Sequence, residues 1–123
     1  MKRFIVIVSA LTALALLAAP ARADDKIGIV LMHGKQGAPL GSTPAGSNRP
    51  PIGGRLIGNL KSAGYLVETP EMCWSRRRGL DHTLDQCLRE IDDAIEAVHL
   101  YGASAIVVGG LSQGGNAALY LII

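Results

Sequence analysis

The sequence predicts an α/β fold with a mostly parallel sheet and flanking helices, and two observations support this class. Three short apolar runs lack the alternation of half-exposed strands, which is typical of strands buried on both faces. The stretches that follow them carry apolar residues every three or four positions, as amphipathic helices do. Strands that alternate with helices form βαβ units, so we expect parallel pairing with right-handed crossovers.

The first strand is expected at 27–32, where the sequence reads IGIVLM. It leads into a loop, residues 33–51, that holds four glycines and four prolines. A loop this long exceeds what a simple connection needs and is a candidate binding loop. A helix is expected over 52–63, and Gly64 supplies its stop.

The second strand and the strongest helix follow. Residues 65–69, YLVET, form the expected strand, which ends before a proline. Thr83 and Gln86 stand at the spacing of a capping box, in which each side chain bonds the other residue's backbone N–H. Apolar residues then form one stripe at helical spacing as far as Val98, and Gly102 closes the helix.

A third strand, 105–108, runs into a glycine-rich turn and a last helical segment, 116–123. This segment ends in five apolar residues, without a capping glycine, a basic last turn or a polar tail. Such an ending at a natural terminus would form an exposed sticky patch. We therefore expect that the sequence stops inside a helix and that the domain is incomplete at its C-terminus.

Residues 1–23 have the pattern of a secretory signal peptide. They begin with a basic pair, continue with an apolar run over 4–19, and end in Ala-Arg-Ala. The run is shorter than the roughly 20 residues that span a bilayer, so we expect no stable membrane anchor after cleavage. Cleavage before Asp24 would leave residues 24–123 as the domain of an exported protein, periplasmic or secreted.

Removal of the signal peptide changes the composition. Of the 123 residues 100 remain, with nine basic residues against ten acidic ones, and the formal net charge falls from +2 to about −1. This balance removes any case for nucleic-acid binding driven by overall charge. A length of 100 residues suits one small domain, while multi-domain, transmembrane-bundle and disordered architectures are excluded. The oligomeric state stays open.

Cys73 and Cys87 both lie in the mature chain and would meet an oxidising compartment after export. A disulfide between them is one interpretation. The other is two independent thiols, one in a loop and one on a buried helix face. Two cysteines at this separation without paired histidines do not have the spacing of a zinc site, so we expect no metal.

The motif with the most chemistry is Gly110-Leu111-Ser112-Gln113-Gly114, which matches G-x-S-x-G between a strand and a helix. In this pattern a strained turn projects the serine hydroxyl, and the two glycines let the strand and helix backbones pass closely. Here the sequence resembles the α/β-hydrolase superfamily, with Ser112 in the place of its catalytic nucleophile. The resemblance covers about residues 26–123 and the first half of a typical fold.

A second feature agrees with this resemblance. His33-Gly34 follows the first strand, where members of the superfamily often carry an HG turn that helps to form the oxyanion hole. The resemblance implies that the backbone N–H of Lys35 or Gln36 is one oxyanion donor and that of Gln113 the other. It also implies that the HG strand lies beside the nucleophile strand, with the intervening strand on the far side.

The superfamily's acid and histidine follow the nucleophile in the chain, and here the sequence stops at Ile123. We therefore expect both to be missing, which leaves Ser112 without the base that a neutral hydroxyl needs. None of the three histidines is a convincing substitute. His33 belongs to the turn, His82 to the start of the long helix, and His99 to its last turn, where a cation suits the helix dipole.

Two further features allow more than one interpretation. The run Arg76-Arg77-Arg78 follows the second strand and could hold an anionic substrate group, although a charge run is more often a solvated loop. The glycine-rich turn could cradle a phosphate, but Gly115-Asn116 stands where a P-loop requires Lys followed by Ser or Thr. We therefore expect no cofactor.

The sequence predicts an exported serine hydrolase that acts on an ester, thioester or amide of a small molecule with an acyl group. The alternative is a non-catalytic exported binding protein that keeps the Ser112 turn and lacks the triad. A downstream Asp or Glu followed by a His would favour the enzyme.

Overall fold

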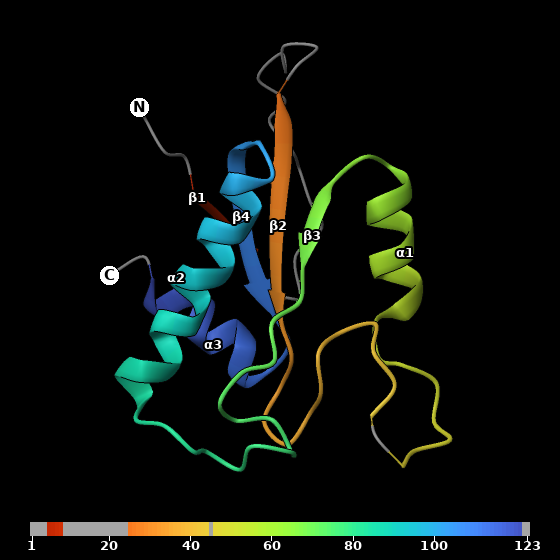
Figure 1. Ribbon diagram of the computed structural model, residues 1–123, viewed down its shortest axis with the longest axis vertical. Helices are drawn as coiled ribbons and strands as arrows, with labels where there is room; N and C mark the ends of the chain where they lie inside the picture. The colour runs from red at the N-terminus through yellow and green to blue at the C-terminus, as the bar shows by residue number, and fades with distance from the viewer. Residues whose placement is uncertain (1–4, 9–24, 45, 122–123) are drawn as a thin grey trace.

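The computed structural model describes residues 5–8, 25–44 and 46–121 (Figure 1). It confirms the α/β class, with a parallel sheet and three helices. The strands are β1 (Ile5–Val8), β2 (Lys26–Met32), β3 (Leu66–Glu68) and β4 (Ala103–Gly110), and the helices are α1 (Gly54–Ser62), α2 (Leu84–Leu100) and α3 (Gln113–Tyr120).

The strand order in the sheet is β1-β4-β2-β3, and every neighbouring pair is parallel. β2 therefore lies beside β4, with β3 on the far side of β2. The β2–β4 register pairs Met32 with Gly110, so the two strands end at the same level. Because the carboxyl ends meet there, the residues that follow each strand, His33 and Leu111, emerge side by side.

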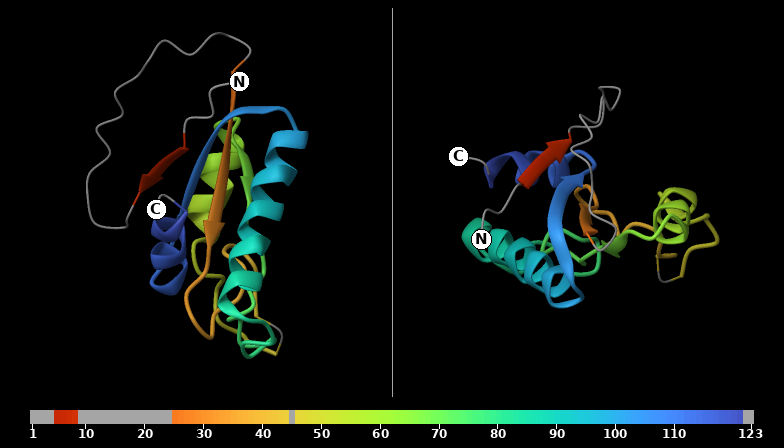
Figure 2. Two further views of the ribbon diagram at one scale, coloured as in Figure 1. Left: turned by 90° about the vertical axis from the view of Figure 1, so that its left-hand side faces the viewer. Right: turned by 90° about the horizontal axis from the view of Figure 1, so that it is seen from above.

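α2 forms as the sequence predicts. Gln86 N–H donates to Thr83 Oγ1, and Thr83 N–H donates to Gln86 Oε1, which completes the capping box. The helix runs along the sheet beside β2 and β4 (Figure 2). The buried members of its apolar stripe are Cys87, Ile91, Ala94 and Val98.

The hydrophobic core draws on the loop after β3 as well as on strands and helices. Met72, Cys73, Trp74 and Ser75 are each almost completely buried, although they lie outside any helix or strand. The first three pack with Val30, Met32 and Val108 of the sheet and with the apolar face of α2. In Figure 1 this loop, the loop after β2 and the start of α2 gather at the carboxyl ends of the strands.

Two expectations for the chain ends need comment. β1 lies within the predicted signal peptide and pairs with β4 from Ile5 opposite Ile106 to Val8 opposite Gly109. The rest of that segment, residues 1–4 and 9–23, is outside the described part, so the signal peptide and its cleavage stay predictions. α3 begins three residues before the expected helix start, because the turn at Ser112 leads straight into it.

Among the described residues, no helix combines the length and apolar character that a membrane crossing requires.

Candidate functional site

Ser112 sits in a strained turn between β4 and α3. Its backbone angles are φ 50° and ψ −116°, a combination that residues with a Cβ rarely adopt. The residue is exposed, and its side chain makes no capping hydrogen bond to the helix that it precedes. The predicted strained strand-to-helix turn is therefore present, with the hydroxyl free of the helix end.

Gly110 and Gly114 allow this turn because their backbones are in close contact. A Cβ on Gly110 would lie 2.6 Å from the carbonyl carbon of Gly114 and 2.8 Å from Met32 O. A Cβ on Gly114 would lie 2.7 Å from Met32 O and 2.8 Å from His33 O. Real Cβ atoms do not approach backbone this closely, so the expected reason for both glycines is confirmed.

The HG turn lies against Ser112. A Cβ built on Gly34 would be 3.4 Å from Ser112 Cβ and 4.0 Å from its Oγ. In addition, Leu111 N–H donates to Met32 O at 3.0 Å, which extends the β2–β4 pairing up to the turn. The fold thus brings together the HG turn and the G-x-S-x-G turn.

His33 is a structural residue of the HG turn. It is 1% exposed, and both ring nitrogens are hydrogen bonded. Nε2 accepts from Met72 N–H at 3.1 Å, which assigns the ring proton to Nδ1, and Nδ1 donates to Gly34 O at 2.8 Å. Trp74 Nε1–H donates to His33 O at 2.9 Å. His33 therefore has no free nitrogen with which to activate Ser112.

The other two histidines are also held elsewhere. His82 Nδ1 bonds to Asp81 O at 2.9 Å, and His99 Nδ1 bonds to Ala103 O at 3.1 Å. Within residues 25–44 and 46–121, no hydrogen bond links a histidine to Ser112 Oγ. The same residues contain no group of three metal-ligating side chains. The three histidines are thus all hydrogen bonded to groups other than Ser112.

The two alternatives for the first oxyanion donor differ in their hydrogen bonds. Gln36 N–H already donates to Trp74 O at 2.9 Å, and Gln36 itself has φ 60°. In contrast, the N–H groups of Lys35 and Gln113 have no acceptor among the described residues. Lys35 and Gln113 are thus the two predicted donors that remain free to bind an anion.

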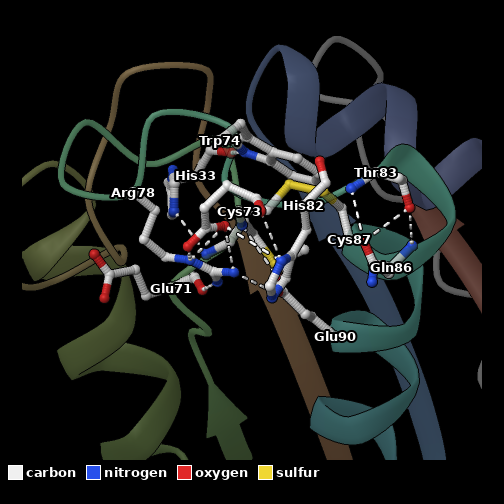
Figure 3. Close-up of a disulfide and its surroundings, with 12 residues drawn as sticks. His33, Glu71, Cys73, Trp74, Arg78, His82, Thr83, Gln86, Cys87 and Glu90 are labelled. Atoms are coloured by element: carbon white, nitrogen blue, oxygen red, sulfur yellow. Dashed lines mark hydrogen bonds and ion pairs between the residues drawn. A yellow bond between two sulfur atoms is a disulfide. The ribbon is translucent and has the colours of Figure 1, made fainter.

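A disulfide joins Cys73, in the loop after β3, to Cys87 in the first turns of α2, with a Cα–Cα distance of 5.5 Å (Figure 3). Ionic contacts support the same junction. Glu90 Oε2 accepts from Cys73 N–H at 2.9 Å, and Glu90 Oε1 pairs with the Arg78 guanidinium at 2.6 Å. Arg78 also pairs with Asp81 at 2.8 Å. We call these five residues, together with His33 and Trp74, the junction network.

The three consecutive arginines have different roles. Arg78 belongs to the junction network, where its carboxylate partners raise its pKa. Arg77 pairs with Glu71, and its hydrogen bond is the main cause that lowers the pKa of Glu71 from 4.5 to about 2. The side chain of Arg76 is exposed and has no carboxylate partner among the described residues. Of these three arginines, Arg76 is therefore the one without a carboxylate partner in the described part of the chain.

Several residues of the junction network did not stand out in the sequence. The sequence gives no strong sign of the role of Trp74 or Glu90. Trp74 does belong to an apolar run, Met72-Cys73-Trp74, within the loop expected after the second strand. That run was the available signal, since three apolar residues between polar neighbours favour burial. Glu90 carries no comparable local signal, because its partners are 12 and 17 residues away.

Two hollows are lined by residues that lie close in the chain to the HG turn or to Ser112. The smaller, of about 380 Å³, lies between the start of α2 and α3; Gln113, the residue after Ser112, lines it with mostly apolar neighbours. The larger, of about 1380 Å³, is a groove formed by the loops after β2 and β3, and Gln36 lines it. Each hollow thus includes a neighbour in the chain of one of the two turns, Gln113 after Ser112 and Gln36 after the HG turn.

Comparison with protein-family models, curated proteins and solved structures finds no match to this chain.

Proposed function

We propose that this chain carries the nucleophile of an exported serine hydrolase of the α/β-hydrolase superfamily, and that Ser112 attacks an ester, thioester or amide carbonyl. The observation that carries the proposal is the backbone of Ser112, at φ 50° and ψ −116° in a G-x-S-x-G turn between a parallel strand and a helix. Strain of this kind costs about 1 to 3 kcal/mol and persists where the fold needs the side chain in one position.

The strand order supports the same proposal. β2, which leads into the HG turn, lies beside β4, which leads into Ser112, and β3 lies on the far side of β2. This is the arrangement that the resemblance implies. Open parallel sheets bind ligands where the strand order reverses, at the carboxyl ends of the strands. Ser112 and Gly34 stand at that edge.

The proposed chemistry begins with attack of Ser112 Oγ on the carbonyl carbon. The carbonyl oxygen gains negative charge in the tetrahedral intermediate and would be held by the N–H groups of Lys35 and Gln113. Each well-placed donor of this kind contributes roughly 2.7 to 4 kcal/mol to the stability of the transition state. Both N–H groups are free of acceptors among the described residues, as this role requires.

The attack also needs a base for the hydroxyl proton. His33, His82 and His99 bond elsewhere, so we expect the triad histidine and acid to come from outside residues 25–121. The alternative function is a non-catalytic exported binding protein. It is favoured by one observation: Ser112 Oγ has no proton acceptor in the described part of the chain.

A fluorophosphonate probe distinguishes the two functions on the full-length protein, since it reacts covalently with activated serines. We expect labelling of the wild type, loss of labelling in Ser112→Ala, and unchanged labelling in Ser104→Ala, an exposed serine at the start of β4. Labelling that persists in Ser112→Ala would rule out this nucleophile. An unlabelled wild type would favour the binding protein.

For residues 1–123 alone we expect little or no hydrolysis of p-nitrophenyl esters, because none of the histidines in the described part of the chain is hydrogen bonded to Ser112. Substantial hydrolysis that depends on Ser112 would show that these residues complete a triad, contrary to the proposal.

A further inference from the structure

The groove formed by the loops after β2 and β3 is fixed at one end by backbone hydrogen bonds. Gln36 N–H donates to Trp74 O at 2.9 Å, and Arg76 N–H donates to Gly37 O at 3.0 Å. Gln36, Gly37 and Arg76 all line the groove. Backbone hydrogen bonds therefore hold this part of its wall in place.

The lining of the groove carries an excess of positive charge. Its charged members are Arg49, Arg76, Arg77 and Glu71. Glu71 forms an ion pair with Arg77, so these two charges compensate each other. Arg49 and Arg76 are exposed, and the described residues supply no carboxylate for either. Two arginines without a carboxylate partner among the described residues therefore line the same groove.

The rest of the lining is largely apolar or small. Ala38, Pro39, Pro44 and Ile52 contribute, and Ile52 is 67% exposed. A ligand that matches this lining has an aliphatic body and an anionic end. Guanidinium groups bind carboxylate and phosphate well, because their planar N–H donors match two oxygens at once.

The groove lies next to the proposed catalytic turn. Gln36 follows Lys35, whose N–H is the proposed oxyanion donor, and Gly34 is in contact with Ser112. A substrate whose carbonyl reaches Ser112 can therefore extend its far end along the loop toward Arg76 and Arg49.

We propose that this groove binds the anionic end of the substrate, a carboxylate or phosphate on an aliphatic chain remote from the reacting carbonyl, through Arg49 and Arg76. As a statement about substrate the inference rests on the proposed function, while anion binding itself does not require Ser112 to react.

Calorimetric titration of the whole chain with adipate, hexyl phosphate and the neutral adipamide tests the proposal. We expect both anions to bind and adipamide not to bind. Binding should weaken between about 20 mM and about 300 mM salt, because the contacts are exposed charges. Binding of either anion supports the proposal, and the tighter one identifies the group that the arginines prefer.

The double variant Arg49→Gln/Arg76→Gln should weaken anion binding by roughly three- to tenfold, the range expected for two exposed ion pairs. Arg89→Gln is the matched control, since Arg89 is exposed on α2 and does not line the groove. Circular dichroism checks that each variant is folded. Equal affinities in the wild type and the double variant, an equal loss in Arg89→Gln, or equal binding of adipamide would overturn the proposal.

Ser112→Ala separates this inference from the proposed function. It should abolish fluorophosphonate labelling of the full-length protein and leave adipate binding unchanged. Anion binding through the two arginines in a protein whose Ser112 never labels would refute the hydrolase and keep the groove. Labelling at Ser112 without anion binding would refute the groove and keep the hydrolase.

Discussion

The two sides of the candidate site are built in opposite ways. On the HG-turn side, His33 and Trp74 are buried, their ring nitrogens are hydrogen bonded, and a disulfide and ion pairs hold the surrounding loop. On the nucleophile side, Ser112 is exposed and has strained backbone angles. One side is fixed by satisfied polar contacts, and the other by close packing of backbone against backbone.

The difference shows how a strained serine can persist in a small domain. The described residues contain no buried side-chain nitrogen or oxygen that lacks a partner, so the junction network is a rigid support for the loops. Met32 O and His33 O lie so close to Gly114 that no Cβ would fit there. The hydrogen bond from Leu111 N–H to Met32 O restrains the turn further. The strain at Ser112 is maintained by its neighbours rather than by its own contacts.

The two largest effects are expected to be of similar size, and the first is that of Gly114→Ala. The added Cβ would lie within 2.8 Å of the carbonyl oxygens of Met32 and His33, which are backbone atoms that cannot rotate away. We expect a loss of about 3 kcal/mol in the free energy of unfolding, the upper part of the usual range for overpacking. Urea denaturation followed by circular dichroism measures it.

Gly58→Ala is the matched control for this substitution. Gly58 lies inside α1, and a Cβ there would meet no atom within 4 Å. Because alanine is the better helix former, we expect a gain of about 0.5 to 1 kcal/mol. If Gly114→Ala also leaves the free energy of unfolding unchanged or raises it, backbone packing does not hold the turn at Ser112. The two sides of the site would then not differ in the way described.

The second effect concerns the junction network. The Cys73–Cys87 disulfide closes a span of 14 residues, and a loop of that size stabilises a domain by about 3 kcal/mol by restricting the unfolded chain. The double variant Cys73→Ala/Cys87→Ala should unfold at correspondingly lower urea concentration. Reduction of the wild type should have a similar effect, whereas the double variant should not respond to reductant. A wild type that is equally stable when reduced would show that the other contacts hold the loop alone.

The parts of the site that the sequence predicts are those encoded by short stretches of chain. The capping box of Thr83 and Gln86 needs contacts only three residues apart, and the glycines around Ser112 specify a turn within five residues. The apolar runs at β2 and β4 were found for the same reason. In each case the local pattern and the fold require the same residues.

The parts that the sequence does not predict depend on long-range contacts. The bond from Met72 N–H to His33 Nε2 spans 39 residues, and the one from Trp74 Nε1–H to His33 O spans 41. No periodicity in the sequence indicates that Gln36 N–H donates to Trp74 O, so the sequence alone does not distinguish Lys35 from Gln36 as the proposed donor. The Cys73–Cys87 pairing stayed open for the same reason.

The smallest effect is a pH dependence at the rim of the junction network. The hydrogen bond from Arg77 is the main cause that lowers the pKa of Glu71 from 4.5 to about 2, with a further contribution from the Ser75 hydroxyl, while burial acts in the opposite direction. A carboxylate whose pKa is lower in the folded state contributes stability above its unfolded pKa. That contribution is fully present above about pH 4.5 and is lost as the pH falls toward 2.

Glu71→Gln removes this contribution, so the difference in unfolding free energy between wild type and variant should shrink as the pH is lowered from 4.5 toward 2. The effect should be small, because the Arg77 side chain is 76% exposed and water screens the pair. Urea denaturation across this pH range measures it, with the exposed Glu96→Gln as control. A difference that grows toward low pH, or one that Glu96→Gln reproduces, would mean that Glu71 is not held as a carboxylate by Arg77. In that case Glu71 would not compensate Arg77, and Arg49 and Arg76 would no longer be distinguished from Arg77 as the arginines of the groove that lack a partner.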